Sequence, residues 1–183
     1  QQYLAALDLT SLNKIIEIDE DSLLATAQTG IYGIEFEKIL NRQGLTLGHF
    51  PQSFEYTTLG GWIAARSSGQ NSAGYGSINK MVVDLKVLTP VGIIETEKAP
   101  NMATGPLLKE VLIGSEGSLG VISSCTLKVS HLPEKKDYYM LFFKNFEDSC
   151  LAARLIAQSE ATPSMVRVSD GDETEAMMSF ASA

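Results

Sequence analysis

The sequence has few of the residues that cross-link small proteins or bind transition metals. Its 183 residues contain two cysteines, Cys125 and Cys150, and two histidines, His49 and His131. The cysteines form no CxxC pair, and neither histidine has a second histidine or a cysteine at ligand spacing. This pattern gives no support to a disulfide framework, a zinc ribbon or an iron–sulfur cluster. We therefore expect no metal site and two buried thiols.

The sequence also lacks a long apolar run and an excess of positive charge. No stretch approaches the roughly 20 apolar residues that span a bilayer, and the N-terminal residues have neither a basic flank nor a signal-like apolar core. The 14 Lys and Arg are outnumbered by 22 Asp and Glu, for a net charge of −8. We expect a cytoplasmic protein that neither inserts into membranes nor binds nucleic acid.

Hydrophobic periodicity is present, and it predicts an α+β protein. Apolar alternation is typical of strands, and apolar residues three and four positions apart are typical of helices. The predicted helices are 32–44 and 107–112. The turn TPVG at 89–92 joins two strands into a hairpin. The predicted strands are 4–9, 14–18, 22–27, 81–88, 93–96 and 121–129, the last with Val121, Ser123, Cys125, Leu127 and Val129 on one face. We expect a mixed or antiparallel sheet flanked by helices.

A polar segment, HLPEKKD at 131–137, separates two patterns of hydrophobicity. Its proline and clustered charges are typical of a domain boundary. Beyond it, the pattern predicts a strand at 138–143, a helix at 146–158 and a strand at 165–168, which together make a βαβ unit. We therefore expect one domain over 1–130 and the beginning of another over 131–183.

Three loops are rich in glycine and hydroxyl residues, at 51–61, 65–76 and 114–122. Glycine lets a backbone approach a ligand closely, and serine and threonine hydroxyls are hydrogen-bond donors and acceptors. The chain lacks GxSxG, HExxH and P-loop motifs, and its one near match to GxGxxG lacks the last glycine. The loops are candidates for binding a nucleotide through backbone N–H groups. The alternative is that these residues only make turns.

Three long segments resemble a known family of flavoproteins. They are HFPQSFEYTTLGGWIAARSSG at 49–69, YGSINKMVVDLKVLTPVGIIE at 75–95 and NMATGPLLKEVLIGSEGSLGVIS at 101–123. They are similar to the FAD-binding (PCMH-type) domain of the vanillyl-alcohol-oxidase flavoproteins, and within them to the alkyldihydroxyacetonephosphate synthases. TGP at 104–106 and RSSG at 66–69 favour that synthase branch.

The resemblance implies FAD as the cofactor and assigns its contacts to the three loops. It also implies that residues 1–130 are the later part of the FAD-binding domain, without its N-terminal part, and that 131–183 begin an α+β substrate or cap domain. Gln52 stands where the family has Asp, which puts one loop contact in doubt. The implied contacts are Ser53, Phe54, Glu55, Tyr56, Thr57 and Thr58, then Ala65, Arg66, Ser67 and Ser68, and finally Glu116, Gly117, Ser118, Leu119, Gly120, Val121 and Ile122.

The resemblance leaves three functions open. The first is an FAD-dependent oxidoreductase of the FAD-linked oxidase type that acts on a 2-hydroxy acid or an alcohol. The second is an alkylglycerone-phosphate synthase, which uses its flavin to exchange an acyl for an alkyl group without net redox change. The third is a non-catalytic fragment. We expect an intact parent flavoenzyme with a small-molecule substrate, a chain that is inactive alone, and leave a homodimer open.

A few single residues complete the sequence-based predictions. Arg167 matches an arginine that the resemblance places beside the flavin, where a guanidinium holds a substrate phosphate or stabilises negative charge; the alternative is a surface arginine. Trp62 is expected to pack in the core rather than to stack on the flavin. His49 and His131 are expected to be solvated loop residues.

Overall fold

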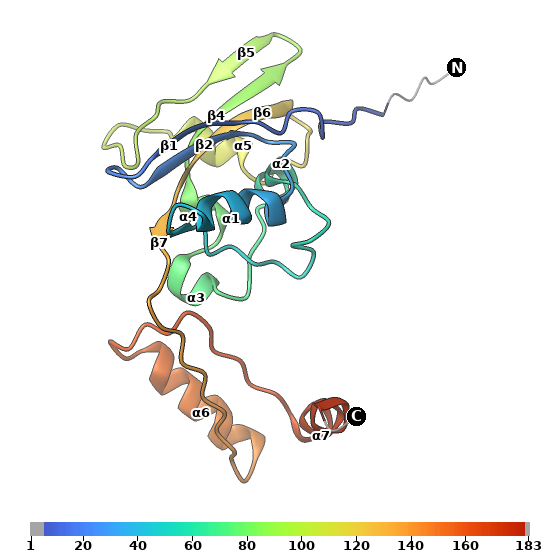
Figure 1. Ribbon diagram of the computed structural model, residues 1–183, viewed down its shortest axis with the longest axis vertical. Coiled ribbons are helices and arrows are strands. Elements are labelled where there is room, and N and C mark those ends of the chain that lie inside the picture. Colours follow the sequence, from blue (N-terminus) through green and yellow to red (C-terminus); the bar gives the residue numbers. More distant parts are fainter. Residues whose placement is uncertain (1–5, 182–183) are drawn as a thin grey trace. The chain divides into compact units, whose positions relative to one another are not determined.

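The computed structural model describes residues 6–181, and the chain divides into two compact units, 1–132 and 133–183. The first unit is built on a five-stranded antiparallel sheet with the order β1-β2-β6-β4-β5. Sequence neighbours β1 and β2 form one hairpin, β4 and β5 form another, and β6 joins the two hairpins (Figure 1). The strands are β1 (Ile15–Asp19), β2 (Leu24–Gln28), β4 (Val82–Thr89), β5 (Gly92–Glu95) and β6 (Val121–Lys128).

Short helices accompany this sheet. Figure 1 shows α1, α2 and α4 on one side of it. A small two-stranded sheet pairs β3 (Leu45–Thr46) with β7 (Ser130–His131). The helices of this unit are α1 (Gly33–Asn41), α2 (Leu59–Ala64), α3 (Ser72–Tyr75), α4 (Ile78–Met81) and α5 (Leu108–Leu112). The architecture is α+β with an antiparallel sheet flanked by helices, which confirms the predicted fold class.

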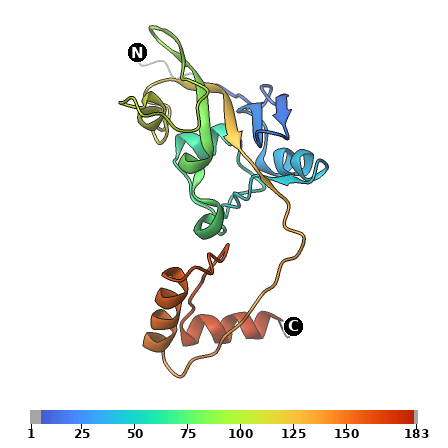
Figure 2. The same cartoon turned by 90° about the vertical axis from the view of Figure 1, so that its left-hand side faces the viewer.

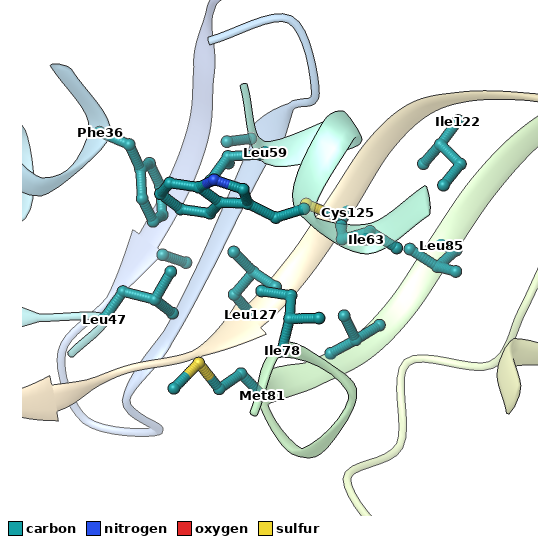
Figure 3. Close-up of a cluster of buried hydrophobic side chains, with 14 of the residues drawn as sticks. Phe36, Leu47, Leu59, Ile63, Ile78, Met81, Leu85, Ile122, Cys125 and Leu127 are labelled. Carbon is teal, nitrogen blue, oxygen red and sulfur yellow. The ribbon is translucent and has the colours of Figure 1, made fainter. Parts of the chain in front are cut away.

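The core of the first unit lies between the sheet and helices α1 and α2. Phe36 and Leu40 are four positions apart on α1, so they share one face, and both are fully buried. Leu59 and Ile63 of α2 lie over β6 (Figure 3). Burying a side chain of this size contributes roughly 1.5–3 kcal/mol relative to leaving it exposed. This packing fixes the position of α2, although a six-residue helix is too short to be stable alone.

Strand β6 corrects the predicted alternation of residues 121–129. The strand itself is confirmed, and Cys125, Leu127 and Val129 are buried as expected. Its pairing with β4 shifts between Lys86 and Val87, which leaves an extra residue in β6. Such a bulge reverses which side chains face the core. Ile122 is therefore buried, whereas Val121 and Ser123, the two residues that the alternation predicts for the core face, are only partly buried.

The N-terminal strand predicted at 4–9 is wrong for residues 6–9, and residues 4 and 5 lie outside the described part of the chain. Residues 8–12 form turns instead. The Asp8 carboxylate accepts a hydrogen bond from the Thr10 N–H at 2.8 Å, and the Leu12 N–H donates to the Leu9 carbonyl at 2.8 Å. These local bonds compete with a sheet ladder.

The second unit contains two helices, α6 (Phe146–Ala157) and α7 (Gly171–Ala181), both visible in Figure 2. The Asn145 side chain caps α6 by accepting a hydrogen bond from the Asp148 N–H at 2.8 Å. The predicted helix is confirmed, but the predicted strands at 138–143 and 165–168 are not formed, so the βαβ unit is wrong. A strand needs a hydrogen-bonded neighbour, and the described residues pair none with either segment.

Two further observations concern exposure and hydropathy. Cys125 is buried and Cys150 is exposed, so the expectation of two buried thiols is wrong for Cys150. Burial raises the pKa of the Cys125 thiol.

Across the described residues, every helix is too short or too polar to cross a bilayer.

Candidate functional site around helix α2

Helix α2 brings the three predicted loops together. We define the first loop as 51–58, the second loop as 65–70 and the third loop as 114–120. The first loop leads directly into α2 and the second follows it directly. The third loop is distant in sequence but is hydrogen-bonded to the last turn of α2, since the Gly114 N–H donates to the Ile63 carbonyl and the Glu116 N–H to the Ala64 carbonyl, each at 3.0 Å.

The hydroxyl groups at the end of the first loop hold the loop itself. The Thr58 hydroxyl caps α2 by accepting a hydrogen bond from the Gly61 N–H at 3.3 Å. The Thr57 hydroxyl accepts from the Trp62 indole N–H at 2.7 Å and donates to the Ser53 carbonyl at 2.8 Å. Trp62 is 2% exposed, as the sequence predicted for a core residue. These threonines therefore have structural partners, while Glu55 and Tyr56 beside them are exposed.

The second loop is fixed by its backbone. The Ser67 N–H donates to the Trp62 carbonyl at 3.0 Å, and the Ser67 carbonyl accepts from the Ile78 N–H at 3.2 Å. The Gln70 N–H donates to the Phe50 carbonyl at 3.0 Å, so this loop runs beside residues 49–50. A Cβ on Gly69 would lie 2.6 Å from the Phe50 nitrogen, and glycine is required for this close approach.

Arg66 connects the second loop to helix α5 and the third loop. Its guanidinium donates to a Glu110 carboxylate oxygen at 3.1 Å and to the Ile113 carbonyl at 3.5 Å. The Lys109 ammonium attaches the same helix to β4 by donating to the Val82 carbonyl at 3.1 Å. These contacts hold α5 against the sheet and the second loop, so the third loop that follows α5 has a fixed starting point.

Strained backbone is found in the second and third loops. Arg66 has a φ of 51° and Glu116 a φ of 49°, in the left-handed region that costs non-glycine residues free energy. Gly117, next to Glu116, has a φ of 79°, and a Cβ placed on it would meet nothing within 4 Å. Such strain is found most often at functional sites. The open space over Gly117 leaves its backbone accessible to a ligand.

His49 is buried beneath the second loop, which corrects the expectation of a solvated residue. Its side chain is 1% exposed, and its ring meets Trp62 edge-on with 4.9 Å between ring centroids. Its Nε2 lies 2.8 Å from the Ser67 hydroxyl. Its Nδ1 is buried without a partner among the described residues. Burial lowers the pKa of His49 to about 4, so the imidazole is neutral at pH 7.

Sequence reasoning missed the position of His49, although a signal for it exists. Leu45, Leu47 and His49 alternate along the chain, and alternation behind two buried leucines predicts a third side chain on the same face. His131, by contrast, is exposed on β7.

The structure brings most of the predicted site residues together, but their exposure differs. The first two loops flank α2 in sequence, and Gly114 and Glu116 at the start of the third loop are hydrogen-bonded to its last turn. Gly120, at the end of the third loop, lies against β4 instead. Ile122, just beyond the third loop, is 6% exposed and its side chain belongs to the core. Arg167 lies in the second unit, where its guanidinium pairs with the exposed Glu173 carboxylate. The exposed predicted residues are Ser53, Glu55, Tyr56, Ala65, Arg66, Ser68, Glu116, Gly117, Ser118 and Leu119.

The chemistry of these loops fits a dinucleotide cofactor. The Ser67 hydroxyl and the open backbone at Gly117 are groups that bind phosphate oxygens and polar ring edges without requiring lysine. This matters because the net charge of −8 opposes an anionic ligand at long range, so local donors have to bind it. The Ser118 hydroxyl, by contrast, donates its hydrogen to the Ser115 carbonyl within the third loop.

Two family models match the chain. The FAD-binding domain matches residues 4–97, and the C-terminal domain of FAD-linked oxidases matches residues 132–183.

Individual relatives agree with these models. An alkyldihydroxyacetonephosphate synthase of Dictyostelium discoideum is 39% identical over 181 residues, which are 99% of this chain and 29% of that protein. The FAD-linked oxidoreductase YgcU of Escherichia coli K12, itself described as uncharacterised, is 35% identical over 91% of this chain and 35% of that protein. A solved structure of an alkyldihydroxyacetonephosphate synthase superposes with a TM-score of 0.85 at 40% identity, covering 93% of this chain and 31% of that one. This chain thus spans about a third of the length of these proteins. With both family models in sequence order and loops that fit a dinucleotide, the chain belongs to the FAD-linked oxidases, and its cofactor is FAD.

Proposed function

We propose that this chain is part of an alkyldihydroxyacetonephosphate synthase. Such an enzyme replaces the acyl group of an acyl-dihydroxyacetone phosphate with the alkyl group of a long-chain alcohol and releases the fatty acid. The observation that carries the proposal is the similarity to a synthase along nearly the whole chain, at 39% identity in sequence and a TM-score of 0.85 in structure.

In this proposal the two parts of the chain have different tasks. Residues 1–130 hold FAD, and residues 131–183 begin the domain that binds the substrate. The gathering of the three loops around α2 supports the first assignment, because loops that share one helix can contact one ligand. The match of the FAD-linked oxidase C-terminal domain to residues 132–183 supports the second.

FAD, when bound, supplies the reactive ring of the family's chemistry, and the residues of the three loops hold it. Ser67 offers a hydroxyl, and Gly117 offers backbone that no side chain covers. In this proposal the threonines of the first loop support the site indirectly, because their hydroxyls orient Trp62 and cap α2. Their contribution to the cofactor site is rigidity, and a rigid site loses less entropy when a ligand binds.

Arg167 is the proposed substrate-binding residue. A guanidinium presents paired donors that match a phosphate group, and the substrate of a synthase carries a phosphate. In the chain alone, the Glu173 carboxylate accepts from this guanidinium. The proposed role requires the guanidinium to exchange this exposed carboxylate for the substrate phosphate. An exposed pair of this kind contributes little stability, so the exchange has a small energetic cost.

The second candidate is oxidation of a 2-hydroxy acid or an alcohol by the flavin. The 35% identity to an FAD-linked oxidoreductase of Escherichia coli favours it. A non-catalytic chain is the third possibility, and it predicts neither reaction.

The test uses the protein in its natural full length. We expect it to purify with a flavin absorption spectrum and to exchange the acyl group of a dihydroxyacetone phosphate ester for a radiolabelled alcohol. Bleaching of the flavin by D-lactate or glycolate without air, in the absence of alkyl exchange, would instead establish the oxidoreductase. A colourless protein that binds no added FAD would overturn the cofactor assignment.

A pair of matched glycine variants tests the site itself. Gly117 and Gly44 are both exposed, have φ values of 79° and 71°, and have open space within 4 Å of the point where a Cβ would stand. Gly117→Val and Gly44→Val therefore introduce similar backbone strain. We expect only Gly117→Val to lose flavin on purification, because its Kd for FAD should rise at least about tenfold. Equal flavin content in the two variants would show that the third loop does not contact the cofactor.

A further inference from the structure

The contact between His49 and Ser67 places a buried imidazole next to a loop hydroxyl. Ser67 is half-buried in the second loop, and its backbone N–H and carbonyl are both already bonded, to Trp62 and Ile78. Its hydroxyl lies 2.8 Å from His49 Nε2. The side-chain hydroxyl is therefore the group of Ser67 that can still take a second partner.

The direction of this hydrogen bond follows from the environment of the other ring nitrogen. A neutral imidazole carries one N–H and one lone pair, and Nδ1 is buried without a partner among the described residues. Native proteins leave buried N–H groups unpaired less often than they leave acceptors incompletely paired. The hydrogen therefore belongs on Nε2, which donates it to the Ser67 oxygen, while Nδ1 keeps its lone pair.

This arrangement determines what the Ser67 hydroxyl can do. Its oxygen accepts from His49, so its own hydrogen cannot point at the imidazole and is available for another acceptor. Trp62 holds the imidazole from one side through the edge-on ring contact. The Gln70 N–H bond to the Phe50 carbonyl keeps the second loop beside residues 49–50, at 3.0 Å. The donor is thus oriented before any ligand arrives.

We propose that His49 is a positioning residue that makes Ser67 an obligatory hydrogen-bond donor to an oxygen of bound FAD. This inference rests on the proposed binding of FAD at the three loops. It assigns to the buried histidine no contact with the cofactor and no proton transfer. The acceptor is an oxygen of either the pyrophosphate or the isoalloxazine ring, because both accept hydrogen bonds.

The first experiment needs no cofactor. Correlating the ring nitrogens and carbon-bound protons of ¹⁵N-histidine by NMR in the 183-residue chain at pH 7 identifies the tautomer of each imidazole. We expect His49 to be neutral with its hydrogen on Nε2, and the exposed His131 serves as the reference for a solvated ring. A hydrogen on Nδ1, or a charged imidazolium at pH 7, would overturn the proposal.

The second experiment measures the Kd of FAD for variants of the full-length protein. We expect Ser67→Ala and His49→Leu each to raise this Kd about tenfold, the size of one hydrogen bond to a polar or charged acceptor. The double variant should be no weaker than either single variant, because the two residues act through one bond. His49→Gln keeps an N–H at a similar place and should restore most of the affinity.

The controls separate this inference from the proposed function. His131→Gln should leave the Kd unchanged. If the wild-type protein binds no FAD, the proposed function fails while the tautomer measurement still decides the orientation of Ser67. If the wild type binds FAD and the losses of His49→Leu and Ser67→Ala add, or His49→Gln rescues nothing, the positioning role is wrong. The absorption maximum of FAD bound to Ser67→Ala identifies the acceptor: a shifted maximum means the isoalloxazine, and an unshifted one the pyrophosphate.

Discussion

Burial of His49 should make the stability of the chain depend on pH. The pKa of His49 is lowered from 6.5 to about 4 in the folded chain by loss of solvent. As the pH falls below 6.5, the histidine is protonated in the unfolded chain before it is protonated in the folded chain. The free energy of unfolding is therefore unaffected by this group above pH 6.5 and decreases as the pH falls from 6.5 toward 4. Between pH 7 and pH 5, the free energy of unfolding of the wild type should decrease by about 2 kcal/mol more than that of His49→Gln.

Urea unfolding followed by the fluorescence of Trp62, the single tryptophan, measures this difference. Other groups, for example Asp8 and Asp19, titrate below this range, because backbone hydrogen bonds lower their pKa values from 3.8. They are common to both proteins, so only the difference between wild type and variant reports His49. His131→Gln should follow wild type. Parallel pH profiles for wild type and His49→Gln would contradict the prediction.

At the scale of elements, the approach of helix α1 to Trp62 depends on one glycine. A Cβ on Gly33 would lie 2.1 Å from the Trp62 ring. Gly33→Ala must therefore displace the indole that Thr57 holds, and overpacking of this kind costs about 1–3 kcal/mol. Gly171 is a matched control, since it is also the first residue of a helix and a Cβ there would meet nothing within 4 Å.

Urea unfolding of the two alanine variants tests this packing. Gly171→Ala should leave the unfolding followed by Trp62 fluorescence unchanged, because Gly171 lies in the second unit. A Gly33→Ala variant as stable as wild type would show that α1 and α2 can move apart without cost.

The elements differ in how well local pattern predicts them. Helices α1 and α6 and the β4–β5 hairpin follow from periodicity and turn residues, which act within a few positions. The bulge in β6 does not, because it arises where β6 is matched to β4, a strand more than thirty residues away. Segment 138–143 has the composition of a strand but no partner among the described residues. A strand is defined by pairing, and its own residues are insufficient.

At the scale of the whole molecule, the first unit should fold without the second. All the buried residues of the described chain lie before Pro133, and no described side chain of residues 133–180 is buried. We expect a protein of residues 1–132 to unfold at the same urea concentration as the 183-residue chain when Trp62 fluorescence is followed. A free energy of unfolding more than about 1 kcal/mol lower for residues 1–132 than for the 183-residue chain would show that the second unit stabilises the first.

Much of the candidate site is predictable from the sequence. Glycine and hydroxyl residues, together with a family resemblance, identify the three loops, because cofactor binding requires these residue types wherever the backbone must come close. The roles within the loops are not predictable in this way. Thr57 accepts a hydrogen bond from Trp62, Thr58 caps α2, and Arg66 pairs with Glu110 of α5. These partners are determined by how the segments pack together.

Composition and local order along the chain were enough to predict the fold class and most elements of the first unit, and the family resemblance implied the cofactor. These depend on short-range periodicity and on a motif that keeps its order. The convergence of residues 51–58, 65–70 and 114–120 on one helix, and the burial of His49 beneath Ser67, required the folded chain. Both depend on contacts between segments far apart in sequence, whose free energy is gained only when the core packs around α2.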